Sequence, residues 1–83
     1  CAAPSILGRI GLLKGKKATC FPGFEKYLDG AQVLLAPVRV ATDGNITTSR
    51  GMGTSVDLGL EIVKLLISEE KAKELAASTQ YAD

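Results

Sequence analysis

Cys1 and Cys20 are the two strongly nucleophilic residues of this 83-residue chain, which contains no histidine to assist them. A cysteine reacts as its thiolate, and a helix N-terminus favours that form because its unpaired N–H groups and aligned peptide dipoles stabilise negative charge. Cys1 is followed by Ala2, Ala3 and Pro4, a small-residue sequence that predicts the start of a helix. We therefore predict that Cys1 is an activated nucleophile and that the backbone N–H of Ala2 helps to bind an oxyanion.

Both cysteines also have structural interpretations. A free cysteine often serves as a small buried hydrophobic residue, and this is the alternative for Cys1. Cys20 lies in a predicted strand, away from any helix start, so we interpret it as structural. The functional alternative for Cys20 is a second oxidisable or resolving thiol.

A Gly-rich turn, Ser49-Arg50-Gly51-Met52-Gly53-Thr54, is the second segment with chemical potential. It lies between a predicted strand and a predicted helix, where backbone N–H groups can face an anion. A phosphate loop of the Walker type needs Gly-Lys-Ser or Gly-Lys-Thr, and neither occurs here. Two cysteines without histidine also fall short of the four ligands of a typical zinc site. We therefore predict neither a metal nor a cofactor.

The elements that must position these segments follow from apolar periodicity and from turn residues. Residues 1–13 show a helical rhythm with a break near Gly8. The dipeptide Asp43-Gly44 favours a tight turn and predicts a β-hairpin over residues 38–49. The remaining predicted elements are strands at 17–20 and 32–35, a short helix at 25–28, and helices at 56–67 and 69–77.

The two C-terminal helices carry recognisable start signals. Thr54 or Ser55 is predicted to cap the first helix with its side chain, and Ser68 is predicted to cap the second. The apolar residues of the first helix cover more than one face, so we expect it to be largely buried against a sheet or a partner.

Composition limits the classes of protein that this chain can represent. Eighty-three residues make one small domain at most, and 46% hydrophobic with 23% charged residues are typical of a globular protein. Ten basic against nine acidic residues provide no electrostatic footprint for nucleic acid. The apolar runs are far shorter than the roughly 20 residues that span a bilayer. We therefore expect neither nucleic-acid nor membrane partners.

Three sequence blocks in order carry a family resemblance: Cys1–Pro4, Phe21–Glu25 and Asp43–Thr54. Together they resemble the ThiJ/PfpI superfamily over nearly the whole chain. The resemblance implies a flavodoxin-like α/β sandwich, similar to class I glutamine amidotransferases. It also implies that residues 1–83 are the C-terminal portion of a single domain, with the upstream N-terminal half as its partner. Cys1 would then occupy a sharp strand-to-helix turn, as in a nucleophile elbow.

The same resemblance implies a function and a site. Cys1 would attack a small α-oxoaldehyde or its adduct and form a hemithioacetal, in a deglycase- or glyoxalase-type hydrolase or hydratase. The proton-transferring carboxylate would lie outside this chain. The resemblance further implies a cytoplasmic homodimer that needs no cofactor. Arg50 is expected to be an ion-pair or interface residue rather than a catalyst. The residues expected to form a pocket or interface near the cysteine are Phe21, Pro22, Ser49, Arg50, Gly51, Met52 and Gly53.

Two departures from the family pattern affect this interpretation. Phe21 stands where many members have histidine, so this chain alone cannot form a Cys-His dyad. That disfavours the protease and glutaminase branches unless the upstream half supplies the base. Met52 stands where the family often has proline, which predicts a less rigid loop. The alternatives are a non-enzymatic oxidative-stress sensor or redox-regulated chaperone, and an intracellular cysteine peptidase or amidase.

Overall fold

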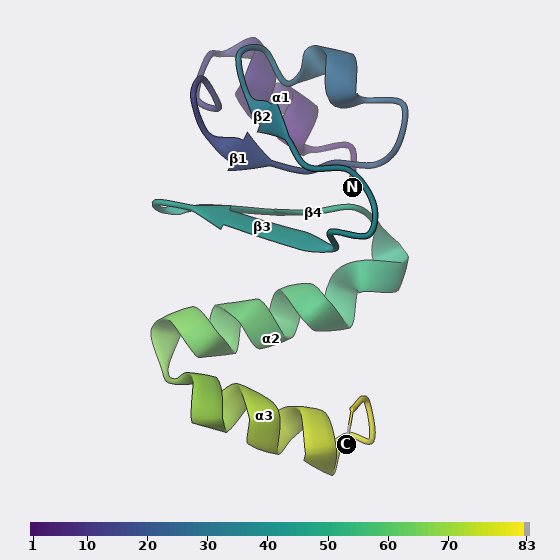
Figure 1. Ribbon diagram of the computed structural model, residues 1–83, viewed down its shortest axis with the longest axis vertical. Helices are drawn as coiled ribbons and strands as arrows, with labels where there is room; N and C mark the ends of the chain where they lie inside the picture. Colours follow the sequence, from purple (N-terminus) through teal and green to yellow (C-terminus); the bar gives the residue numbers. More distant parts are fainter. Residues whose placement is uncertain (83) are drawn as a thin grey trace.

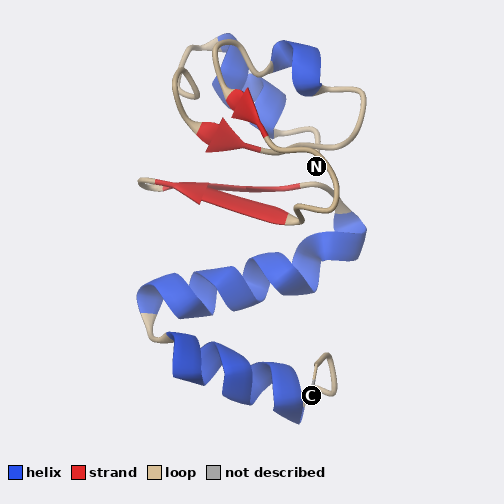
Figure 2. Cartoon of the chain, viewed as in Figure 1, coloured by secondary structure: helices blue, strands red, loops and turns tan. Residues whose placement is uncertain are grey.

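A computed structural model describes residues 1–82 as a stack of helices and short strands (Figure 1). The first helix and a short 3-10 helix lie at one end of the stack, two pairs of strands lie in the middle, and two longer helices lie at the other end (Figure 2). The arrangement confirms the predicted α/β class with a strand hairpin and two C-terminal helices.

Helix α1 spans Pro4–Arg9 and directly follows the cysteine segment. Pro4 stands in its first turn, where the missing N–H has no partner to lose and the ring fixes a helical φ. The helix ends close to the predicted break, although Gly8 itself is helical and buried. The chain turns away at Gly11, whose φ of 82° is readily adopted only by glycine.

Two short strands form a parallel pair. Strand β1 (Lys17–Ala18) pairs with β2 (Gln32–Val33), with Lys17 opposite Gln32. Each strand is two residues shorter than predicted from the sequence. The helix predicted at 25–28 is present between them as η1, a 3-10 turn over Glu25–Tyr27.

The β-hairpin is confirmed. Strand β3 (Val40–Asp43) pairs antiparallel with β4 (Ile46–Ser49), and Gly44 adopts a φ of 62° in the turn, as an Asp-Gly hairpin requires. Side-chain oxygens join the hairpin to β1 and the residue after it: the Lys17 N–H donates to Asp43 Oδ2 at 2.8 Å, and the Thr19 N–H donates to Thr48 Oγ1 at 2.9 Å.

Helix α2 (Ser55–Leu66) follows a 3-10 turn, η2 (Met52–Thr54), and α3 (Glu69–Ser78) completes the chain's helices. The predicted cap of α3 is confirmed, since Ser68 Oγ accepts the Lys71 N–H at 3.0 Å. The predicted side-chain cap of α2 is wrong, because the Thr54 hydroxyl is engaged with Gly51 instead. In the part of the chain that the structure describes, no helix has the length and apolarity to cross a membrane.

The sheet of this chain covers α2 only in part, so burial of the rest of the helix against a partner stays a prediction. No α2 residue is fully buried, and Ile62 and Leu66 are 44% and 79% exposed. The hairpin and α3 cover only part of the helix, where Leu58 and Leu60 are half-buried. Among residues 1–82 no further layer packs on the remaining apolar surface, which leaves that surface for the partner expected from the sequence.

The main core lies between α1 and the strands. Leu13 and Ala18 are fully buried, and Cys20 and Leu28 are 4% and 3% exposed. The residues packed around this cluster come from α1, η1, β2 and β4: Leu7, Phe24, Ala31, Val33 and Ile46.

Candidate functional site

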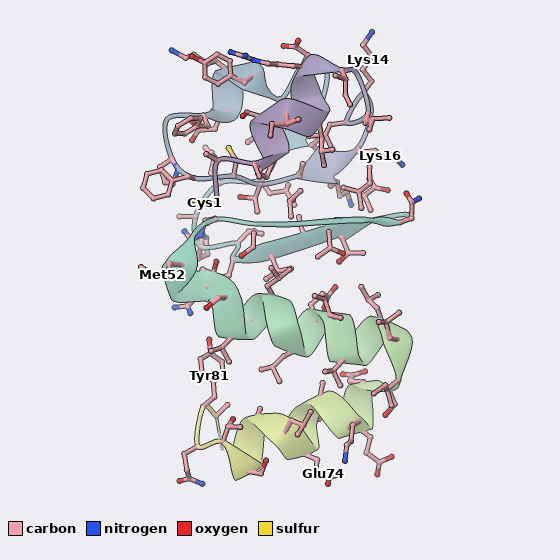
Figure 3. All side chains as sticks on the ribbon, turned by 180° about the vertical axis from the view of Figure 1, so that it is seen from behind. Cys1, Lys14, Lys16, Met52, Glu74 and Tyr81 are labelled. Carbon is pink, nitrogen blue, oxygen red and sulfur yellow. The ribbon has the colours of Figure 1, made fainter. Side chains whose placement is uncertain are left out.

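Two backbone hydrogen bonds hold Cys1 between segments that are distant in the sequence. Its backbone nitrogen donates to the Ser49 carbonyl at the end of β4, at 2.6 Å. Its own carbonyl accepts the Phe21 N–H at 2.7 Å. Figure 3 shows Cys1 at this junction, between the α1 layer and the hairpin. The residue is therefore fixed by its backbone while its side chain stays exposed.

The chain passes directly from Cys1 into α1. The Ala2 carbonyl accepts both the N–H and the hydroxyl of Ser5, at 3.0 Å and 2.7 Å, and so begins the first turn. Ala2 is half-buried. Within residues 1–82 no acceptor is assigned to the Ala2 N–H, which leaves that donor available beside the thiol.

Cys1 stands at the edge of an apolar cavity of about 390 Å³. The cavity lies between the start of α1 and the hairpin, and one residue of α2 also lines it. Its lining residues are Cys1, Ala3, Pro4, Ile6, Leu7, Thr47, Thr48, Ser49 and Leu58. The exposed thiol therefore has apolar surface next to it on which a small organic molecule could rest.

Cys20 occupies the opposite kind of environment. It lies just after β1 and is 4% exposed. Burial raises the pKa of its thiol, and the negative charge of Glu25 raises it further. The structure thus favours the structural interpretation of Cys20, because a buried thiol with a raised pKa is a poor nucleophile.

We expect iodoacetamide to alkylate Cys1 much faster than Cys20 in the native protein at pH 6–7. Cys1 is exposed, whereas Cys20 must wait for a local opening of the core and is disfavoured as thiolate at this pH. Peptide mass spectrometry after timed labelling measures both rates, with the protein in denaturant as the control in which the two rates should converge. Equal labelling in the native protein would contradict the observed burial of Cys20.

The Gly-rich turn after β4 is organised by one hydroxyl. Thr54 Oγ1 accepts the Gly51 N–H at 3.2 Å and lies 2.9 Å from the Gly51 carbonyl, to which it donates. It also forms a hydrogen bond with the Ser49 hydroxyl. Ser49 and Thr54 are both buried. The Ser49 carbonyl in turn accepts a hydrogen bond from the backbone nitrogen of Cys1. Thr54 therefore stabilises the turn that holds the cysteine.

A Thr54→Val substitution should destabilise the protein by about 1–3 kcal/mol, because it leaves the buried Ser49 hydroxyl and the Gly51 peptide without their partner. Thr54→Ser keeps the hydroxyl and is the matched control, with an expected cost below about 1.5 kcal/mol for the lost methyl group. Denaturant melts of the three proteins measure both values. If Val is tolerated as well as Ser, the hydroxyl does not stabilise the turn.

The structure brings some of the predicted pocket residues together and leaves others apart. A second cavity, of about 160 Å³, is lined by Phe21, Pro22, Arg50, Gly51 and Thr54. Its wall is next to Cys1, through the hydrogen bond from Phe21.

Met52 and Gly53 are exposed and line neither this cavity nor the one at Cys1. Met52, 89% exposed, lies at the turn into α2 (Figure 3). The sequence places Thr54 in the Gly-rich turn and predicts its side chain as a helix cap, not as the group that holds the turn. Its role in the turn depends on the conformation of the glycines before it, which residue types alone do not predict.

Among residues 1–82 no three metal-ligating side chains of the His, Cys, Asp or Glu type lie together. The chemistry that this site itself offers is that of an exposed thiol beside an apolar cavity, with Arg50 lining a neighbouring cavity.

The sequence model of the DJ-1/PfpI family matches residues 1–65. The chain is 44% identical over 77 residues to DJ-1 homolog B of Arabidopsis thaliana, covering 92% of this chain and 17% of that protein. It is 42% identical over 76 residues to DJ-1alpha of Drosophila melanogaster, covering 92% of this chain and 35% of that protein. The chain therefore spans well under half the length of these relatives.

An enzyme with a different name and a solved structure are also similar to this chain. Isonitrile hydratase of Pseudomonas putida is 29% identical over 82 residues, covering 99% of this chain and 36% of that protein. A crystal structure of a cysteine-to-alanine mutant of a DJ-1 superfamily protein from Salmonella typhimurium superposes with a TM-score of 0.81 at 28% identity, covering 98% of this chain and 43% of that one. The flavodoxin-like fold expected from the sequence is thereby confirmed, and with the family model matching most of its length, the chain belongs to the DJ-1/PfpI family.

Proposed function

We propose that this chain carries the nucleophile of a cysteine-dependent enzyme that converts small α-oxoaldehydes, or their adducts, into 2-hydroxy acids. One observation carries the proposal: the Cys1 thiol is exposed at the entrance to α1, with its backbone fixed on both sides and an apolar cavity beside it. A fixed nucleophile next to a binding surface is the arrangement that covalent catalysis requires.

The chemistry begins with attack of the Cys1 thiolate on the aldehyde carbon. A carbon–sulfur bond forms, the carbonyl oxygen takes a proton, and the product is a hemithioacetal. A base removes the hydrogen of the former aldehyde carbon as a proton while the neighbouring carbonyl oxygen gains a proton, which gives an enediol. Protonation of the neighbouring carbon and loss of the hydroxyl proton on the sulfur-bearing carbon then give a thioester of the 2-hydroxy acid. Water hydrolyses the thioester and restores the thiol. The net reaction adds one water to the α-oxoaldehyde.

The remaining parts of the site follow from this sequence of steps. The Ala2 N–H, which has no assigned acceptor in the described residues, can donate to the oxygen that becomes negatively charged on attack. The proton transfers require a carboxylate or another base, and this chain has no histidine. The proposal therefore assigns the acid–base group to the rest of the subunit, and it includes a homodimer as the working assembly.

The test uses the full-length protein with methylglyoxal as the substrate. We expect lactate to accumulate as methylglyoxal disappears, and acid quenching during turnover should leave a covalent adduct on the peptide that contains Cys1. Disappearance of methylglyoxal without lactate would indicate simple adduct formation on lysine and arginine side chains. That result, or an adduct confined to other residues, would contradict the proposal.

A second candidate function is oxidation sensing without turnover, which the exposure of Cys1 and the burial of Cys20 also favour. Mild hydroperoxide would then convert Cys1 stepwise to sulfenic and sulfinic acid. Full oxidation of Cys1 together with no lactate from methylglyoxal would favour sensing over catalysis.

A further inference from the structure

The Arg50 guanidinium is a cation without a counter-charge in the part of the chain that the structure describes. Its Nε atom is buried and has no hydrogen-bond partner, and no ion pair joins Arg50 to any carboxylate of residues 1–82. A buried polar group on a charged side chain is costly to leave unpaired. The arrangement therefore indicates that Arg50 receives a partner in the working protein.

Hydrogen bonds fix the backbone on both sides of Arg50. Its neighbours Ser49 and Gly51 are both bound to the Thr54 hydroxyl. The Arg50 N–H donates to the Arg39 carbonyl at 3.4 Å, which extends the hairpin by one more contact. The turn thus fixes the point from which the Arg50 side chain extends, and that side chain lines two cavities.

The two cavities lined by Arg50 differ in size. The larger, of about 160 Å³, lies between Arg50 and Phe21, and Phe21 is hydrogen-bonded to the Cys1 carbonyl. The smaller, of about 30 Å³, has space for little more than water and includes Glu25. Glu25 accepts the Gly23 N–H at 2.8 Å and forms no ion pair with Arg50. The larger cavity is therefore the place where an anion can meet the guanidinium, and its Phe21 wall is joined to the backbone of Cys1.

We infer that Arg50 is a specificity-determining residue that binds the anionic end of the substrate, and that the preferred substrates are α-oxoaldehydes carrying a carboxylate. This inference rests on the proposed function of Cys1. The planar fork of a guanidinium matches the two oxygens of a carboxylate, and a charge-assisted pair of this kind is stronger than a neutral hydrogen bond. The aldehyde end reaches Cys1 while the carboxylate occupies the cavity beside Phe21.

The test compares a charged substrate, 4,5-dioxopentanoate, with its uncharged methyl ester, which differs in covalent structure by one methyl group. The full-length wild-type protein should turn over the acid with a kcat/KM about 10- to 100-fold higher than that of the ester. Arg50→Gln should lower kcat/KM for the acid by a similar factor, mainly through KM, and leave the ester within about twofold. Lys64→Gln, which removes an exposed cation on α2, is the matched control and should change neither substrate.

The outcomes separate this inference from the function on which it rests. If neither substrate nor methylglyoxal yields a hydroxy acid, the proposed function is wrong. If methylglyoxal is turned over but wild type treats acid and ester alike, or Arg50→Gln lowers both equally, Arg50 does not bind the substrate and the inference is overturned. Should Arg50→Gln fail to fold, the wild-type ratio of acid to ester decides, supplemented by Arg50→Lys, which keeps the charge without the fork.

Discussion

Replacing Cys1 by serine is expected to lower kcat/KM for methylglyoxal by about a thousandfold or more, because a serine hydroxyl is far less acidic than a thiol and supplies no appreciable oxyanion at neutral pH. The substitution exchanges sulfur for oxygen at an exposed position, so the fold should be preserved. The loss would therefore report on chemistry rather than on stability.

Cys20→Ser is the matched control for this experiment. It removes the other thiol of the chain from a site that is 4% exposed and outside the cavity at Cys1. We expect it to cost some stability but to retain turnover within a few-fold of wild type. Initial rates of lactate formation, with circular dichroism spectra of each variant, measure both effects. Comparable rates for wild type and Cys1→Ser would show that the reaction does not proceed through Cys1.

The elements that local sequence specifies were predicted well. The hairpin turn depends on Asp43-Gly44, and Gly44 adopts the positive φ that only a few residue types tolerate. The cap of α3 is also local, because the Ser68 hydroxyl accepts a hydrogen bond from the N–H of Lys71, three residues later. The family was also predicted from local sequence, because the three blocks that carry the resemblance are short runs of residue types in a fixed order.

What the sequence did not predict depends on distant parts of the chain. Strands β1 and β2 end earlier than their apolar pattern predicts, because only two residues of each find a partner in the other. The apolar pattern of α2 predicted burial, yet burial needs a covering layer, and the hairpin and α3 supply only part of one. The hydrogen bonds of Thr54 in the Gly-rich turn and the buried, unpaired Nε of Arg50 likewise depend on how the chain folds around them.

For the substitution of Gly8 by alanine, helix propensity predicts a gain in stability and tertiary packing predicts a loss. In a helix interior, alanine is more favourable than glycine by about 0.5–1 kcal/mol. A Cβ atom at Gly8, however, would lie 2.2 Å from the Tyr27 carbonyl oxygen and 2.7 Å from the Leu28 Cα. These are backbone atoms, and Leu28 belongs to the buried core, so the contact cannot be relieved by rotating a side chain.

We therefore expect Gly8→Ala to destabilise the full-length protein by about 2 kcal/mol or more, since overpacking costs typically exceed the gain in helix propensity. Gly59→Ala is the control with the opposite sign. Gly59 lies in α2, and among residues 1–82 a Cβ there would meet no atom within 4 Å outside its own stretch of helix, so alanine should stabilise by up to about 1 kcal/mol. Denaturant unfolding of both variants measures the difference. Because Gly8 sets how closely α1 approaches η1, its substitution should also displace the helix that begins just after Cys1 and slow alkylation or turnover there. A Gly8→Ala protein as stable as Gly59→Ala would show that α1 does not pack on η1 as closely as the structure indicates.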